Sequence, residues 1–213
     1  MNRFVRRPKM NAGDLKLSFA AATKRLDMPL PDFDPNGLLP DGVHPATRQD
    51  LEARCVTPFS TSTTRPGILT AFSNYRDALA ALGLNVTQWV DGSFVDQLRL
   101  DPEDVDVVNF GDSANLNAAA AKHGGTQILT LLDGREATKT AYKSHTFLRI
   151  HFPAGHVMAA GFESQRKYWR TWFATPQDYT SSVKVPAPKR GRKGIVQMTV
   201  GDATLCPAVS TDP

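Results

Sequence analysis

The segment 66–108 constrains the fold of this chain more than any other. Apolar residues recur in helical steps of three or four over 68–82, and Gly83 follows them, which predicts an amphipathic helix that stops at that glycine. Two short apolar runs come next, at 86–91 and 104–110, and their β-branched residues favour buried strands. A helix that leads into two buried strands predicts a sheet with helices packed against it.

The flanking segments extend this pattern. Thr47, with Asp50 three residues later, predicts a capping box and a helix through about residue 56. We expect two or three short helices over 113–143, a third strand over 146–152, a helix over 162–173 and a final strand over 195–200. The predicted fold class is therefore α/β or α+β, with a mixed sheet and flanking helices.

The length of 213 residues suits one main domain with extensions, and a core of this size needs no disulfide. We assign 1–31 to a basic N-terminal extension, 32–200 to the domain and 201–213 to a tail. Within the domain, the proline-containing segment 32–45 is expected to lie irregularly across the surface. Cys55 and Cys206 match no metal or redox spacing and are expected to be reduced thiols.

The positive charge is concentrated near the two ends of the chain. Residues 1–25 hold seven basic side chains and one acidic side chain, and a second basic cluster occupies 184–193. These clusters either steer phosphate-rich partners or form a solubilising tail and a solvated loop. No apolar run approaches the ~20 residues that a membrane helix needs, so we expect a cytoplasmic protein with no membrane partner.

The residues that we expect to take part in catalysis follow the first strand and begin the second. Gly92-Ser93 is followed by ten residues and then by Asp104-Val-Asp106. Side chains alternate along a strand, so the two aspartates project from one face, roughly 6–7 Å apart along the chain. Two such carboxylates require a cation when buried and together can hold a hard metal ion. Gly92 permits close backbone approach, and Ser93 adds an N–H and a hydroxyl for phosphate oxygens.

This arrangement of an apolar residue, Gly-Ser, a spacer of about ten residues and Asp-x-Asp on a strand resembles the signature of the DNA polymerase beta nucleotidyltransferase superfamily. Its minimal members include bacterial toxin–antitoxin proteins. The chain also resembles a poorly characterised bacterial nucleotidyltransferase-like family over about 32–200. The features that carry this second resemblance are the entry segment 36–47, the core WVDGSFV, and Tyr168, Trp169, Phe173 and 193–195.

The resemblance implies the mixed sheet of the nucleotidyltransferase fold and a Mg²⁺- or Mn²⁺-dependent activity. Asp104 and Asp106 would be the catalytic and metal-binding residues, and Gly92 and Ser93 would bind the nucleotide. The implied reaction moves a nucleoside monophosphate from an NTP to an RNA 3′ end, such as that of tRNA, to a protein hydroxyl or to a small molecule. A toxin–antitoxin or defence context would follow, and the sequence leaves the oligomeric state open.

The chain departs from that superfamily at one position. Its members usually place a third carboxylate on the following strand, beside the Asp-x-Asp pair, whereas 145–152 contains no acidic residue. Three alternatives remain open: His145 or His151 replaces the acid, Glu163 comes in from a neighbouring element, or catalysis is impaired. The last alternative describes a catalytically degraded fold that acts as a nucleotide- or partner-binding interaction protein.

Other prominent residues have simpler interpretations. The spacing of Lys139 and Lys143 predicts one helical face, which either meets a triphosphate or is plain surface. For the nearby acids we expect loop or solvent positions; they are Asp91, Asp96, Asp101 and Glu103. Three aromatic residues are expected to pack in the core, or to stack on a base if they lie near a nucleotide; they are Tyr168, Trp169 and Trp172.

Overall fold

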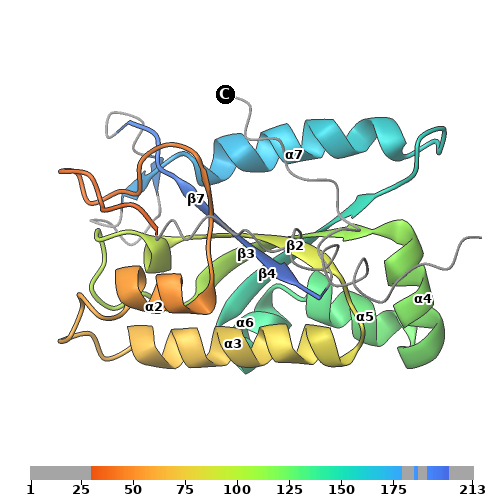
Figure 1. The fold of residues 1–213 in the computed structure, drawn as a ribbon, viewed down its shortest axis with the longest axis horizontal. Coiled ribbons are helices and arrows are strands. Elements are labelled where there is room, and N and C mark those ends of the chain that lie inside the picture. The colour runs from red at the N-terminus through yellow and green to blue at the C-terminus, as the bar shows by residue number, and fades with distance from the viewer. Residues whose placement is uncertain (1–29, 179–184, 187–190, 202–213) are drawn as a thin grey trace, which may run out of the picture.

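A five-stranded sheet runs through the middle of the molecule in the order β1-β7-β2-β3-β4 (Figure 1). The computed structural model describes residues 30–178, 185–186 and 191–201. The strands of this sheet are β1 (Val43–Pro45), β2 (Val86–Asp91), β3 (Val105–Asp112), β4 (Ser144–His151) and β7 (Ile195–Val200). Strand β2 is antiparallel to both β3 and β7, while β3 is parallel to β4 and β1 to β7. The predicted mixed sheet is confirmed.

Helices cover both faces of the sheet. They are α2 (Arg48–Cys55), α3 (Arg65–Ala81), α4 (Ser113–His123), α5 (Gly125–Leu132), α6 (Glu136–Tyr142) and α7 (Ala159–Phe173), with a short 3₁₀ helix η1 (Ser93–Val95) after β2. Figure 1 shows α7 on one face, with α2, α3, α5 and α6 on the other. A second, two-stranded sheet pairs β5 (Gln177–Asp178) with β6 (Val185–Pro186).

Local sequence signals set most of these boundaries. Thr47 forms the predicted capping box with Asp50 at the start of α2. Pro66 lies in the first turn of α3, where its missing N–H costs nothing, and α3 ends just before Gly83, which has a positive φ of 69°. The predicted strands at 86–91 and 195–200 match β2 and β7.

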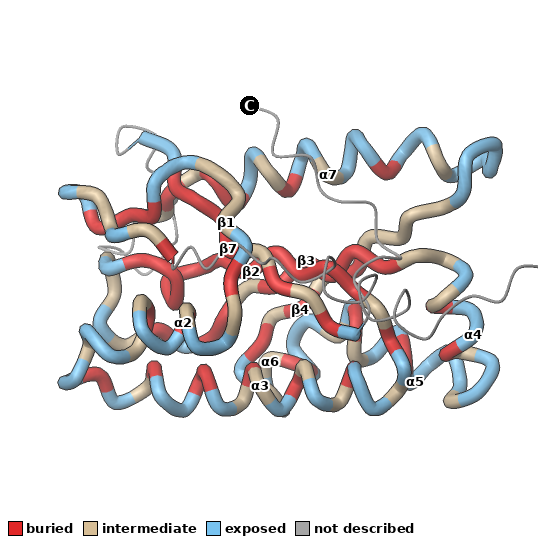
Figure 2. The backbone as a smooth tube through the Cα atoms, viewed as in Figure 1, coloured by how far each residue is buried: buried red, intermediate tan, exposed pale blue. Residues whose placement is uncertain are grey.

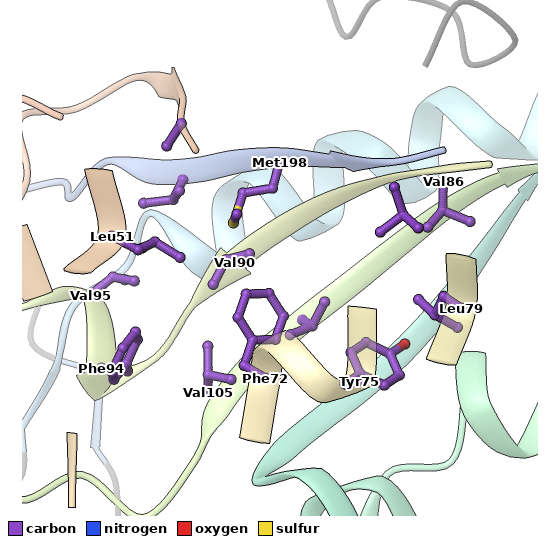
Figure 3. Close-up of a cluster of buried hydrophobic side chains, with 14 of the residues drawn as sticks. Leu51, Phe72, Tyr75, Leu79, Val86, Val90, Phe94, Val95, Val105 and Met198 are labelled. Atoms are coloured by element: carbon purple, nitrogen blue, oxygen red, sulfur yellow. The ribbon is translucent and has the colours of Figure 1, made fainter. Parts of the chain in front are cut away.

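Strand alternation divides the core between the two faces. On the larger side, α3 packs Phe72 and Tyr75 against Val86, Val90 and other inward residues of the sheet (Figure 3). On the α7 side, a smaller aromatic cluster forms from Trp89, Phe110, Phe162, Trp169 and their neighbours. Each fully buried Val, Leu or Phe contributes about 1.5–3 kcal/mol relative to exposure, so both faces of the sheet are firmly held.

Two expectations about packing need correction. Segment 32–45, expected to be irregular throughout, contributes β1, because its last residues pair in parallel with β7. Tyr168 and Trp172 are not core residues, since they are 54% and 52% exposed while Trp169 is buried. Figure 2 shows the reason: α7 contacts the sheet along one side only, and its outer side is exposed.

The ends of the chain are only partly described. Several predicted features lie outside the described residues: the basic residues of 1–25, Cys206 and nearly all of the tail 201–213. Leu30, at the edge of the proposed extension, is buried in the larger core. Cys55 is also buried there, and burial raises the pKa of its thiol to about 12, as suits an unreactive thiol. Among the described helices, none is both long and apolar enough to cross a membrane.

Candidate active site

Three polar side chains form a row across neighbouring strands. Asp91 of β2 is the register partner of Asp106 on β3, and Asp106 is the partner of His145 on β4. Directly opposed residues in a sheet project to the same face. Because Trp89 and Phe147 lie two residues from Asp91 and His145 and belong to the α7-side cluster, the whole row faces α7.

Asp104 joins this row to make a group of potential metal ligands. One ligand atom from each of Asp104, Asp106 and His145 lies within 4.8 Å of the others. The i, i+2 spacing of the aspartates produces this proximity, and the buried Val105 and Val107 hold the strand from the opposite face. Two carboxylates and an imidazole are a donor set that suits a divalent cation.

Each aspartate already has a basic partner. The Lys139 ammonium lies 3.0 Å from the Asp104 carboxylate, and His145 Nδ1 lies 3.2 Å from Asp106 Oδ1. These hydrogen bonds raise the pKa of Lys139 and of His145. Glu103 lies 3.9 Å from the same ammonium, so Lys139 has a second carboxylate to bind if a cation takes Asp104.

Gly92 is required at its position for two reasons. Its φ is 87°, in the left-handed region that favours glycine, and a Cβ placed there would lie 2.6 Å from Asp106 Oδ2. Gly92 is therefore the residue of the Gly-Ser pair that approaches the carboxylates. Ser93 follows it, buried at the start of η1.

The loop after Gly92 is held by Arg65, a contact that the sequence analysis did not anticipate. The five N–H groups of the buried guanidinium are shared among six backbone carbonyls, those of Cys55, Ser93, Phe94, Asp96, Arg99 and Leu100. It also lies 3.7 Å from the centroid of the Phe59 ring. Arginine suits this task because its planar group presents five donors in fixed directions. The helical pattern that begins at Pro66 does not reveal that the preceding residue points inward.

A buried ion cluster supports the Gly92 turn. It shows that the positions expected for two of the nearby acids were wrong. Asp91 and Asp96, assigned to loop or solvent, are buried and lie 3.0 and 3.4 Å from the Lys193 ammonium. Lys193 also donates to the Gly92 carbonyl, at 3.2 Å. Burial raises the pKa of Asp91 to about 7, because the loss of hydration disfavours the charged carboxylate by more than the Lys193 ammonium stabilises it. The one sequence signal is that Lys193 lies two residues before the apolar strand β7.

The structure distinguishes the three residues that the sequence offered in place of a third carboxylate, His145, His151 and Glu163. His145 lies beside Asp106, whereas His151 pairs with Asp112 at the other end of the same strands, 3.5 Å away. Glu163 pairs with Arg166 on α7. Of these three candidates, only His145 joins the aspartates. The two lysines have different positions. Lys139 binds Asp104, whereas Lys143 follows the last residue of α6 and has a left-handed backbone conformation.

A cavity of about 260 Å³ opens beside this group. Its lining includes Asp91, Gly92, Asp106, His145 and Trp172. The cavity therefore offers a ligand carboxylates, an imidazole and a half-exposed indole.

Comparison with known proteins places the chain in a family but gives that family no activity. No curated protein and no solved structure matches the chain. A family model matches residues 31–199, which is most of the chain and contains every site residue described above. The chain belongs to the family of unknown function DUF6932.

Proposed function

We propose that this protein is a metal-dependent nucleotidyltransferase that moves a nucleoside monophosphate from an NTP to an acceptor hydroxyl. The observation that carries the proposal is the convergence of Asp104, Asp106 and His145 within 4.8 Å, facing the Gly92 turn. The strand order adds support. The Asp-x-Asp strand lies between the strand that leads into Gly-Ser and the strand that follows, as the resemblance to the polymerase beta superfamily implies.

The donor set fits the implied cation. Asp104 is nearly buried and Asp106 about one-quarter exposed, so their charges are poorly hydrated and depend on nearby positive groups, which a metal ion would add to Lys139 and His145. Carboxylate oxygens are the ligands that Mg²⁺ and Mn²⁺ prefer. When bound to Asp104 and Asp106, such an ion would neutralise the carboxylates and the charge on the phosphates.

The chain's own residues then have separate tasks. Gly92 lets the backbone approach the triphosphate closely, and Ser93 supplies an N–H and a hydroxyl. The Nδ1 atom of His145 stays hydrogen-bonded to Asp106, which leaves Nε2 to take the proton of the acceptor hydroxyl. The acceptor oxygen bonds to the α-phosphorus, the bond from that phosphorus to the bridging oxygen breaks, and pyrophosphate leaves with the electron pair.

Two classes of acceptor have support from the sequence. The basic residues of 1–25 and the cluster near the C-terminus support an RNA 3′ end, such as that of tRNA, because positive charge attracts phosphate backbones. The resemblance to toxin–antitoxin proteins supports a hydroxyl on a partner protein. An assay of the proposed activity must therefore offer both acceptors.

The test is transfer of label from α-labelled NTPs, with Mg²⁺ or Mn²⁺, to total tRNA and to the product of the neighbouring gene. We expect label transfer with pyrophosphate release, and a loss of about a thousandfold in Asp106→Ala, since charge stabilisation by a metal is worth several kcal/mol. Asp112→Ala is the matched control, because it removes the aspartate of the second Asp–His pair on the same two strands. Equal loss in both variants would contradict the assignment of the site.

A second candidate function is nucleotide or partner binding without turnover. His145 in place of a third carboxylate favours it, because an imidazole leaves the site less negative than a third acid would. Calorimetric binding of metal–NTP that disappears in Asp106→Ala, with no pyrophosphate release for any acceptor, would select this alternative. Absence of both binding and transfer would exclude the two functions together.

A further inference from the structure

The cavity beside Asp106 and His145 is lined by two chemically different sets of side chains. The proposed transfer reaction uses only the polar set. The other set is aromatic and consists of Phe147 of β4 with Trp172 and Phe173 of α7. Aromatic rings in the same cavity as a group of potential metal ligands restrict what the cavity can bind.

Trp172 is the most exposed part of this aromatic wall. Its side chain is 52% exposed in the last turn of α7, although the adjacent Phe173 is buried. Tyr168, one turn earlier, stacks on the indole with ring centroids 6.2 Å apart and planes inclined by 15°. The indole is thus held in place by a neighbouring ring while one part of it faces the cavity. Large exposed aromatic surface in a cavity is a common sign of a binding site.

Phe147 connects the wall to the proposed reactive groups. It lies two residues after His145 on β4, and its ring is 4.6 Å from the His145 imidazole. On its other side it is 4.6 Å from the Trp169 indole, which is buried under α7. Packing therefore fixes Phe147, and a ring bound against the wall would keep a defined position relative to His145.

The size of the cavity and its edge groups narrow the ligand class. About 260 Å³ is slightly below the ~300–1,000 Å³ of complete small-molecule pockets, so the cavity suits part of a ligand that extends beyond it. Gln177, which lines the cavity, donates one amide N–H to the Thr175 carbonyl at 3.3 Å, which leaves its second N–H and its carbonyl oxygen for a ligand. A planar heterocycle with polar edges can stack on the aromatic side chains, and a phosphate tail attached to it can reach the polar ones.

We propose that Trp172 and Phe147 form the base-binding wall for the incoming nucleoside triphosphate, with Gln177 contacting the edge of the base. This inference rests on the proposed nucleotidyl transfer and extends it to the placement of the nucleotide. The triphosphate lies beside Asp106 and Gly92, and the base stacks against the indole. Because stacking accepts any base, Gln177 sets the preference among the four.

The test compares ligands with and without a base. Calorimetry measures the binding of Mg²⁺–ATP and of Mg²⁺–tripolyphosphate to the full chain and to Trp172→Leu and Trp172→Phe. We expect Trp172→Leu to weaken ATP binding by roughly 5- to 100-fold, the usual range for loss of one base–aromatic stack, and to leave tripolyphosphate binding unchanged. Trp172→Phe should restore most of the ATP affinity. Leu129→Ala is the control, since that side chain is 55% exposed on α5 and does not line the cavity.

The outcomes separate this inference from the function on which it rests. If wild type binds both ligands and Trp172→Leu binds ATP equally well, the base wall is refuted while the metal–phosphate site stands. If wild type binds neither ligand, the proposed function fails and the base wall with it. If Trp172→Leu weakens only the binding of a short single-stranded RNA, the wall holds the terminal base of the acceptor, and the assignment to the NTP is overturned.

Discussion

Strands β3 and β4 carry the same pair of side chains twice, once at each end. Asp106 faces His145 at one end, and Asp112 faces His151 at the other, each in direct register. The pairs have similar exposure, and their closest nitrogen–oxygen distances are 3.2 and 3.5 Å. Two residues in isolation would therefore not distinguish one end of the sheet from the other.

The surroundings of the two pairs are different. Around Asp106 lie a second carboxylate at Asp104, the tight Gly92 turn and a cavity. Asp112 instead caps α4, because its carboxylate accepts hydrogen bonds from the N–H groups of Ala114 and Asn115. An Asp–His pair therefore becomes a candidate active site only through the residues around it and their charges. Without them, it serves the local structure.

The largest effect is expected at Lys193, the buried cation that contacts the Gly92 turn. We expect Lys193→Met to lower the free energy of unfolding by about 3–5 kcal/mol, because it leaves Asp91 and Asp96 buried without their ammonium. Lys167→Met, on the exposed side of α7, should change it by less than about 0.5 kcal/mol. Urea unfolding of both variants measures this, and a small effect at Lys193 would show that the ion cluster does not hold the turn.

The next test concerns the approach of Gly92 to Asp106. Gly92→Ala combines backbone strain of about 1–3 kcal/mol with a clash against Asp106 Oδ2, so we expect Mn²⁺ affinity to fall by roughly tenfold or more. Gly83→Ala is the matched control, since its φ is also positive and nothing lies within 4 Å of the added carbon. Calorimetric titration with Mn²⁺ should show a loss of affinity only in Gly92→Ala. Equal affinities in the two variants would argue against a metal at Asp106.

A smaller effect is expected from pH. The hydrogen bond that the imidazole donates to Asp106 raises the pKa of His145, so this imidazole stays protonated to higher pH than the ordinary value of about 6.5. Since the base must be neutral to accept a proton, transfer activity should fall about tenfold per pH unit below that raised pKa and level off above it. His145→Gln should remove this limb of the pH–rate profile. His151→Gln should leave it in place, and loss of the limb in that variant instead would move the base to the other pair.

The smallest effect is expected at the capping pair. Asp112→Ala removes the side-chain cap of α4 and should lower the free energy of unfolding by about 0.5–2 kcal/mol. Metal and nucleotide binding should not change, because Asp112 is absent from the ligand group and the cavity. Thermal unfolding and Mn²⁺ titration of this one variant check both statements. Weakened Mn²⁺ binding would show that the two ends of the sheet are coupled.

The sequence by itself determined the elements whose signals are local. The Thr47–Asp50 capping box, the periodic face of α3 and the apolar runs of β2 and β7 act over a few residues, so their bounds followed from the chain alone. The same holds for Asp104 and Asp106, because a period of two puts both on one face of any strand.

Tertiary structure decided which distant residues complete the site. The pairing of β3 with β4 selected His145 over His151 and Glu163, and the path of β7 carried Lys193 under Gly92. The face of α7 that packs on the sheet left Trp172 exposed at the cavity while burying Trp169. These outcomes depend on register and packing between segments far apart in the chain, and a local pattern of residue types does not encode which distant partner will lie opposite.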